Sequence, residues 1–181
     1  MSQESGAAVF RKGASSGGHE VLDAQSVERA VRRMAHEIVE RNEGVDGVVL
    51  IGLVRGGVWL ADAIGDALAA LGTPVPVGSV DVSFYRDDLE LRSVTPMASA
   101  LSFAIHDRTV VLADDVLFTG RTVRAALDAL REYGRPKSVQ LAVLVDRGHR
   151  ELPIRPDYVG KNVPTSRTER VQATAAGVVL S

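Results

Sequence analysis

The sequence predicts an α/β protein with a mainly parallel central sheet flanked by helices. Residues 48–52, 110–113 and 138–145 form short apolar runs, which are typical of strands that are buried on both faces. The first two runs are each followed by a glycine-containing turn and then by apolar residues at helical spacing. Strands that alternate with helices favour right-handed crossovers, and hence one parallel sheet.

The N-terminal part of the chain divides into a tail and a helix. Residues 1–20 are rich in Ser, Gly and Ala and are predicted to form a flexible tail, which leaves residues 21–181 as a single domain. Asp23 is a candidate N-cap for a helix with an apolar stripe. The polar face of this helix includes Arg32, Arg33 and His36, and the pattern alone indicates a solvated surface.

The first strand leads into Arg55, Gly56 and Gly57, and then into an Ala-rich helix that ends near residue 71. The glycine spacing does not fit the dinucleotide-binding fingerprint. A planar guanidinium beside exposed backbone amides suits an anion. A surface arginine on an ordinary turn is the alternative.

Residues 110–122 join a strand, two carboxylates, a small-residue loop and the start of a helix. Free N–H groups at a helix start bind anions, and Gly120 lets the backbone approach a phosphate closely. Thr119 and Thr122 add hydroxyl donors. Carboxylates would repel a phosphate, so Asp114 and Asp115 are expected to face sugar hydroxyls or a divalent cation. The run therefore predicts a ribose 5-phosphate site, with simple helix capping as the alternative.

Three further segments complete the chain. Residues 75–105 are expected to form a long β excursion with a mobile tip that includes Tyr85 and Arg86. Residues 146–162 form a basic segment punctuated by Pro and Gly, and residues 171–180 are expected to close the chain as a strand.

Composition excludes several classes of protein. The 181 residues include no cysteine, so a disulfide framework, a zinc–thiolate site and a thiol nucleophile are impossible. A net charge of −2 argues against nonspecific nucleic-acid binding by the whole protein, although not by a local basic face. The absence of a signal-like apolar core and of a membrane-length apolar run predicts a cytoplasmic protein.

The run VLADDVLFTGRT, the loop YRDDL and the segment DRGHRELPIRPDYVGKN occur in this order, and together they resemble the PyrR family of type I phosphoribosyltransferases. The match extends from about residue 21 to the C-terminus. The resemblance implies the type I phosphoribosyltransferase fold, with a β-rich flexible loop and a small hood at about 146–164.

The resemblance also implies an activity, the synthesis of UMP and diphosphate from uracil and phosphoribosyl diphosphate (PRPP) with Mg²⁺. Asp114 and Asp115 would hold the ribose hydroxyls and, through PRPP, the Mg²⁺, while Arg55 would contact diphosphate. The residues implied for PRPP or nucleotide binding are Arg55, Gly56, Tyr85, Arg86, Val116, Leu117, Phe118, Thr119, Gly120, Arg121 and Thr122. The residues implied for the base hood are Asp146, Arg147, His149, Tyr158 and Val159.

Phe118 bears on the choice of base. Purine-using relatives carry an acid at this position that assists proton removal, and a phenyl ring cannot replace it. The resemblance therefore favours a pyrimidine.

A second implied role is regulation of pyrimidine genes through leader mRNA, promoted by UMP or UTP. The candidate RNA-binding residues are Arg32, Arg33, His36, Arg150, Arg155 and Lys161, on a concave surface that a dimer or larger homo-oligomer would complete. Two alternatives remain, an RNA-binding regulator with little catalysis and a phosphoribosyltransferase for another base.

Overall fold

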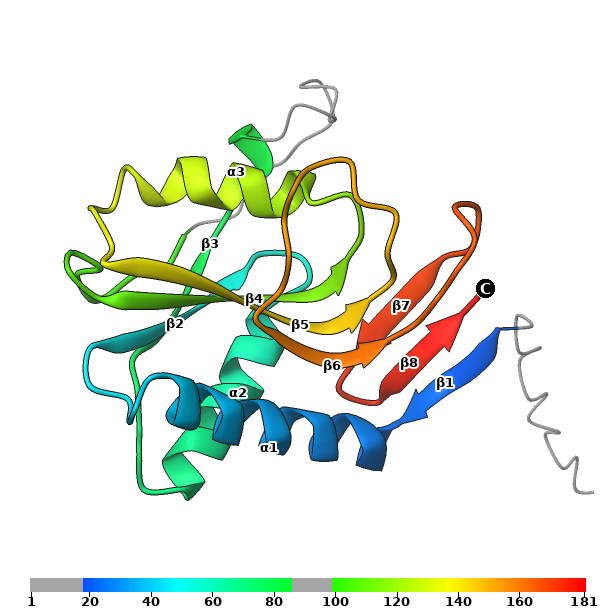
Figure 1. Cartoon of the computed structure of the whole chain (residues 1–181), viewed down its shortest axis with the longest axis horizontal. Helices are drawn as coiled ribbons and strands as arrows, with labels where there is room; N and C mark the ends of the chain where they lie inside the picture. The colour runs from blue at the N-terminus through cyan, green and yellow to red at the C-terminus, as the bar shows by residue number, and fades with distance from the viewer. Residues whose placement is uncertain (1–17, 86–98) are drawn as a thin grey trace, which may run out of the picture.

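A five-stranded parallel sheet forms the centre of the computed structural model, which describes residues 18–85 and 99–181 (Figure 1). The strand order is β3-β2-β4-β5-β6, and every neighbouring pair is parallel. The strands are β2 (Val48–Leu53), β3 (Val77–Val80), β4 (Thr109–Leu117), β5 (Ser138–Asp146) and β6 (Tyr158–Asn162). All six residues of β2 are buried, as expected for a strand covered on both faces. The predicted parallel α/β architecture is confirmed.

Helices cover both faces of this sheet. Helices α1 (Ala24–Arg41) and α2 (Val58–Ala70) pack on one face, and α3 (Arg121–Leu130) packs on the other (Figure 1). The predicted cap of α1 is confirmed, because the Asp23 carboxylate accepts a hydrogen bond of 2.7 Å from the Ser26 amide. Two apolar cores result, one on each side of the sheet.

A second, smaller sheet corrects two predictions about the ends of the domain. It contains β1 (His19–Asp23), β8 (Gly177–Leu180) and β7 (Val171–Thr174) in antiparallel pairs. The predicted tail therefore ends before His19, and the expected single closing strand is a hairpin. The turn uses Gly177, at φ +147°, where a side chain would lie 2.7 Å from the Leu22 carbonyl oxygen.

The β excursion is partly described. After β3 comes a single 3-10 turn, Ser83–Tyr85, and the chain returns through a backbone bridge between Ser79 and Ala100. The predicted tip, including Arg86, lies outside the described residues. In the described part of the chain, no helix has the length and apolar composition that crossing a bilayer requires.

Candidate functional site

The acidic pair lies at the carboxyl end of β4, where the strand continues through both carboxylates. Asp114 pairs with Val143 of β5 and has a relative exposure of only 7%. It lines a cavity of about 290 Å³ together with seven other residues, all of which except Val123 were predicted to bind PRPP. The other lining residues are Val116, Leu117, Phe118, Thr119, Gly120, Thr122 and Val123. One cavity thus joins a buried carboxylate to the start of α3.

Burial raises the pKa of the Asp115 carboxyl, although backbone hydrogen bonds act in the opposite direction. Its Oδ1 accepts a hydrogen bond of 2.7 Å from the Val116 amide, and its own amide donates to Asp114 Oδ1 at 3.1 Å. Two neighbouring carboxylates in a partly dry site make a cation or a set of hydroxyl donors the natural ligand.

The Arg-Gly turn lies against these carboxylates. A Cβ at Gly56 would be 2.5 Å from Asp115 Oδ1 and 3.0 Å from Asp114 Oδ1, and one at Gly57 would be 1.8 Å from the Ala113 carbonyl oxygen. Backbone atoms exclude any side chain at Gly57, and a side chain at Gly56 would have to displace the two carboxylates. Arg55 has φ +82°, a strained conformation for a residue with a side chain. The turn therefore places the exposed Arg55 beside the acidic pair.

Residues 118–120 connect β4 to α3 and are called the phosphate loop below, because a phosphate is predicted to bind there. Gly120 occupies the N-cap position in a left-handed conformation, at φ +93°, and no side chain caps the helix. The Thr119 hydroxyl accepts a long hydrogen bond of 3.4 Å from the Arg121 amide. A left-handed glycine directly before a helix without an N-cap side chain is typical of sites that bind an anion.

The loop between β5 and β6 closes over the phosphate loop. Thr119 O accepts hydrogen bonds from the amides of Glu151 and Leu152, at 3.0 and 3.3 Å. The Arg121 guanidinium donates to Glu151 at 3.0 Å, so its side chain connects the start of α3 to the hood. No local sequence pattern predicts this role of Glu151, since its partner lies 30 residues away.

Arg150 organises the same loop from within. It donates to the carbonyl oxygens of Phe118 and Ile154 at 2.9 and 3.0 Å, and it pairs with Asp146 at 2.5 Å. The donors of Arg150, which was predicted to bind RNA, are used inside the loop, and RNA binding by Arg150 stays a prediction. Asp146, predicted for the base hood, is likewise engaged with Arg150.

Phe118 forms a cluster with two of the predicted hood residues. The Arg147 guanidinium lies 4.2 Å from the centroid of the Phe118 ring, and the His149 ring meets it edge-on at 5.9 Å. Thr165 and Ser166, which lie just beyond the predicted hood, hold Arg147 and His149 in place. Their polar side chains after Pro164 were the only signal available in the sequence.

Tyr158 and Val159 do not lie with the other hood residues. Tyr158 has a relative exposure of 2%, and its hydroxyl donates to Gln140 Oε1 at 2.7 Å. Both residues belong to the start of β6, where Tyr158 pairs with Ala142, four residues before Asp146. The structure does not support the prediction of a base-contacting Tyr158, because its side chain is buried in the core on the α1 side of the sheet. Val159 also packs against a core, on the α3 side.

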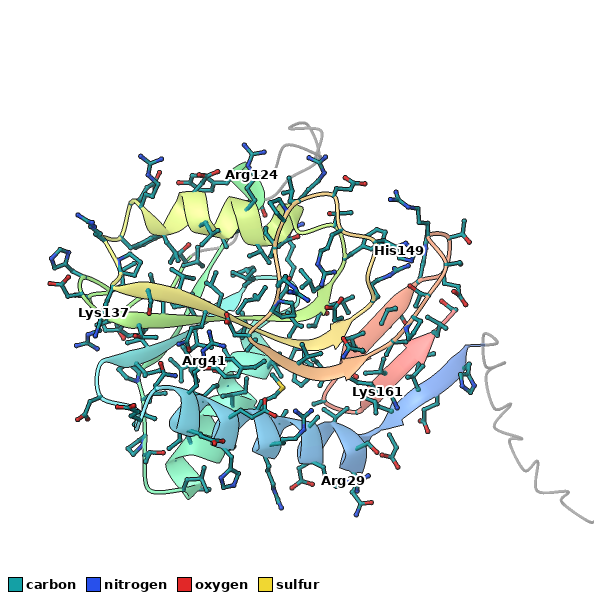
Figure 2. The ribbon with its side chains drawn as sticks, in the orientation of Figure 1. Arg29, Arg41, Arg124, Lys137, His149 and Lys161 are labelled. Atoms are coloured by element: carbon teal, nitrogen blue, oxygen red, sulfur yellow. The ribbon has the colours of Figure 1, made fainter. Side chains whose placement is uncertain are left out.

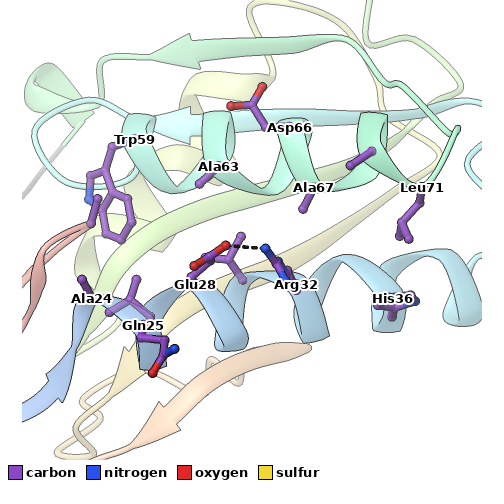
Figure 3. Close-up of a pocket in the computed structure, with 14 residues that line it drawn as sticks. Ala24, Gln25, Glu28, Arg32, His36, Trp59, Ala63, Asp66, Ala67 and Leu71 are labelled. Atoms are coloured by element: carbon purple, nitrogen blue, oxygen red, sulfur yellow. Dashed lines mark hydrogen bonds and ion pairs between the residues drawn. The ribbon is translucent and has the colours of Figure 1, made fainter.

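The candidate RNA residues of α1 fall into two groups. The Arg33 guanidinium donates to the carbonyl oxygens of Val159 and Gly160, at 2.9 and 2.8 Å, so it joins α1 to β6 rather than standing free. Arg32 pairs with Glu28, and Arg32 and His36 line an open groove of about 780 Å³ between α1 and α2 (Figure 3). Lys161 is exposed directly after Gly160, beside α1 (Figure 2), and Arg155 is exposed on the loop before β6.

Tyr85 is not among the residues that line the 290 Å³ cavity. It packs against the core on the α3 side, and a hydrogen bond with Glu132 is the main cause that raises the pKa of its hydroxyl to about 12. The predicted role of Tyr85 in a closing loop stays a prediction.

Comparisons with known proteins place the chain in a family. Residues 17–175 match the model of the phosphoribosyl transferase domain. A protein of Acetivibrio thermocellus named Bifunctional protein PyrR is 58% identical over 155 residues, which cover 84% of each chain. A protein of the same name from Clostridioides difficile is 54% identical and covers 86% of this chain and 89% of its own.

Solved structures agree on the fold. The hypoxanthine phosphoribosyltransferase of Trypanosoma cruzi superposes with a TM-score of 0.67 at 22% identity, covering 82% of this chain and 79% of its own. The hypoxanthine phosphoribosyltransferase of Staphylococcus aureus superposes with a TM-score of 0.66 at 20% identity, covering 81% of this chain and 77% of its own. Since the family model spans most of the chain and the relatives exceed half identity, the chain belongs to the phosphoribosyl transferase family, within the group of proteins named Bifunctional protein PyrR.

Proposed function

We propose that this protein transfers the phosphoribosyl group of PRPP to uracil, giving UMP and diphosphate. The observation that carries the proposal is the single cavity that joins the buried carboxylate of Asp114 to the uncapped start of α3. A ribose 5-phosphate carries hydroxyl groups and an anion on one molecule, which suits a cavity with a carboxylate and a helix start.

Three sets of residues would bind the 5-phosphate, the ribose hydroxyls and the diphosphate of PRPP. The amides at Gly120 and Arg121, with the hydroxyls of Thr119 and Thr122, would bind the 5-phosphate. Asp114 and Asp115 would accept hydrogen bonds from the ribose hydroxyls. The Arg55 turn would bind diphosphate, where charge develops as the bond to C1 breaks.

Mg²⁺ fits this site only as a partner of PRPP. Within residues 18–85 and 99–181, no group of three or more His, Asp or Glu side chains could hold a metal. A cation that arrives with the substrate would offset the charge of Asp114 and of Asp115, whose pKa is raised by burial. Bound there, Mg²⁺ would neutralise the leaving diphosphate.

Uracil is preferred to a purine because Phe118 lines the cavity and cannot accept a proton. The structural neighbours that act on hypoxanthine share about a fifth of their residues with this chain, so they bear on its fold and not on its base.

The assignment is tested by incubating the protein with PRPP, Mg²⁺ and either uracil, orotate or hypoxanthine. The protein should form UMP from uracil much faster than it forms a nucleotide from orotate or from hypoxanthine. The exposed Asp62→Asn on α2 serves as a control that should keep full activity. Nucleotide formed only from hypoxanthine would refute the assignment.

A second function is supported by the relatives' shared name, Bifunctional protein PyrR. We propose that uridine nucleotides promote binding of this protein to the leader of pyrimidine-gene mRNA, through Arg32, His36, Arg155 and Lys161. Arg155→Ala should weaken leader binding and leave UMP synthesis unchanged, whereas Lys137→Ala, which removes the same charge from the loop before β5, should affect neither. Equal loss of both activities in Arg155→Ala would contradict a separate RNA surface.

A further inference from the structure

Two carbonyl oxygens of the phosphate loop are held by the loop between β5 and β6. Phe118 O accepts a hydrogen bond of 2.9 Å from Nη1 of Arg150. Thr119 O accepts hydrogen bonds from the amides of Glu151 and Leu152, at 3.0 and 3.3 Å. These three bonds fix the direction of two consecutive peptide groups, because each carbonyl oxygen points toward its donors.

The direction of each carbonyl group also fixes the direction of the amide that shares its peptide bond. The described peptide bonds are all trans, and in a planar trans peptide the C=O and the N–H point in opposite directions. The N–H groups of Thr119 and Gly120 therefore point away from residues 150–154. Thr119 and Gly120 line the cavity of about 290 Å³, whereas residues 150–154 do not. Both peptide groups thus border the cavity with their carbonyl oxygens turned to the loop between β5 and β6.

Ile154 supports the phosphate loop from the same side. A Cβ at Gly120 would lie 3.2 Å from Ile154 Cδ1 and 3.5 Å from Leu152 Cβ, so these side chains lie against the backbone of Gly120. Ile154 also packs against the core on the α3 side of the sheet, and its carbonyl oxygen accepts a hydrogen bond of 3.0 Å from Arg150 Nε. The left-handed Gly120 therefore rests on a side chain that is itself held by the core.

Resting on the function proposed above, we propose that Ile154 is a positioning residue for the 5-phosphate of PRPP. Together with its neighbours in the loop, it holds the peptide groups of Thr119 and Gly120 in the orientation in which their N–H groups meet the phosphate oxygens. Without this support the phosphate loop would have to be ordered by the ligand, and the affinity would fall by that entropic cost. The diphosphate would bind at the Arg55 turn instead, so it does not depend on Ile154.

The charged neighbours of Ile154 are less suited to a test. Glu151 pairs with Arg121 at 3.0 Å, and Arg150 pairs with Asp146 at 2.5 Å. A substitution in either pair would change the charge near the anion as well as the position of the phosphate loop. Ile154 is uncharged, so its replacement leaves the local charge as it is.

The test uses two ligands that each reproduce one end of PRPP. Ribose 5-phosphate has the 5-phosphate and the hydroxyl groups, and diphosphate with Mg²⁺ has the leaving group. In Ile154→Ala, the Kd of ribose 5-phosphate measured by calorimetry should rise about 10-fold, as for the weakening of one hydrogen bond to a charged group. The Kd of diphosphate should be unchanged. In UMP synthesis, KM for PRPP should rise while kcat stays near that of the wild type.

Two variants separate positioning from a general loss of stability. Ile105→Ala removes the same atoms from a fully buried residue of the same core, beside Gly134 rather than Gly120. It should lower the free energy of unfolding and leave the Kd of ribose 5-phosphate unchanged. Ile154→Val keeps the branched Cβ, so its Kd should lie between those of the wild type and Ile154→Ala.

Equal rises in the Kd of ribose 5-phosphate in Ile154→Ala and Ile105→Ala would overturn the proposal, since lost stability would then explain both. An unchanged Kd in Ile154→Ala, or an equal rise for diphosphate, would also overturn it. If Ile154→Ala does not fold, Ile154→Val decides by the same comparison of the two ligands. Failure of wild-type protein to form UMP would instead refute the proposed function, because binding of ribose 5-phosphate does not require uracil.

Discussion

At the scale of single residues, the site contains a carboxyl group, Asp115, whose charged form is disfavoured by burial in the folded protein. Burial raises the pKa of Asp115, so the folded protein binds the proton more tightly than the unfolded chain does. The stability associated with the protonated form is complete below the unfolded pKa and is lost as the pH rises through the folded pKa. At a pH above the folded pKa, the buried charge of Asp115 therefore lowers the free energy of unfolding.

Asp115→Asn should separate stability from activity. The amide keeps an oxygen to accept the Val116 N–H bond and has no charge to bury, so the free energy of unfolding should rise at neutral pH. Transfer should fall about 10- to 100-fold, as for the loss of a hydrogen bond to a charged acceptor. Urea denaturation and UMP synthesis measure the two effects.

The pH dependence supplies the control for this prediction. The stability advantage of Asp115→Asn should shrink as the pH falls toward the ordinary Asp value of 3.8, where the wild-type carboxyl is protonated. A constant advantage, or near-normal turnover, would contradict the roles given to Asp115.

At the scale of elements, Tyr158 joins α1, β5 and β6. Its hydroxyl donates to Gln140 and lies 3.3 Å from Asn42 Nδ2, at the end of α1. Tyr158→Phe should lower the free energy of unfolding by about 1 kcal/mol, because Asn42 and Gln140 still bond each other. UMP synthesis should be unchanged, since the Tyr158 ring packs in the core on the α1 side of the sheet and does not line the cavity between Asp114 and α3. Loss of uracil affinity in this variant would restore Tyr158 to the base site.

The loop between β5 and β6 depends on Arg150. Arg150→Met removes the donors to Phe118 and Ile154 and leaves the half-buried carboxylate of Asp146 unpaired, so stability should fall by about 2–3 kcal/mol. Because the same loop covers Gly120, both transfer and RNA binding should weaken. The exposed Arg155→Met is the matched control in thermal denaturation, and equal melting temperatures for the two variants would argue against an internal role for Arg150.

Some elements could be predicted from sequence and others could not. The strand, acidic pair and loop at residues 110–122 are contiguous, so local rules are enough to describe them. Tyr158 sits in a stretch with Gly and charged residues that resembles a loop, and only pairing with β5 makes it a buried strand. The partners of Arg147 and Arg121 lie 18 and 30 residues away in the chain, so no local pattern could reveal them.

At the scale of the whole molecule, α1 and β6 form one surface although they lie far apart in the sequence. Arg33 bonds the backbone of β6 directly before Lys161, a contact that spans 127 residues. The net charge of −2 means that RNA can be held only by a local set of cations. The exposed side chains of Lys161 and Arg155 are the candidates on the β6 side of that surface.

The salt dependence of leader-RNA binding should report this surface. For single-stranded RNA, the logarithm of affinity falls with the logarithm of salt concentration at about 0.7 per phosphate contact. Arg155→Ala combined with Lys161→Ala should therefore reduce the slope by about 1.4 if each residue contacts one phosphate. Filter binding across a range of salt concentrations measures the slope, and Arg135→Ala combined with Lys137→Ala, exposed on the loop before β5, removes the same charge as a control. An equal reduction in both double variants would mean that net charge, rather than this surface, holds the RNA.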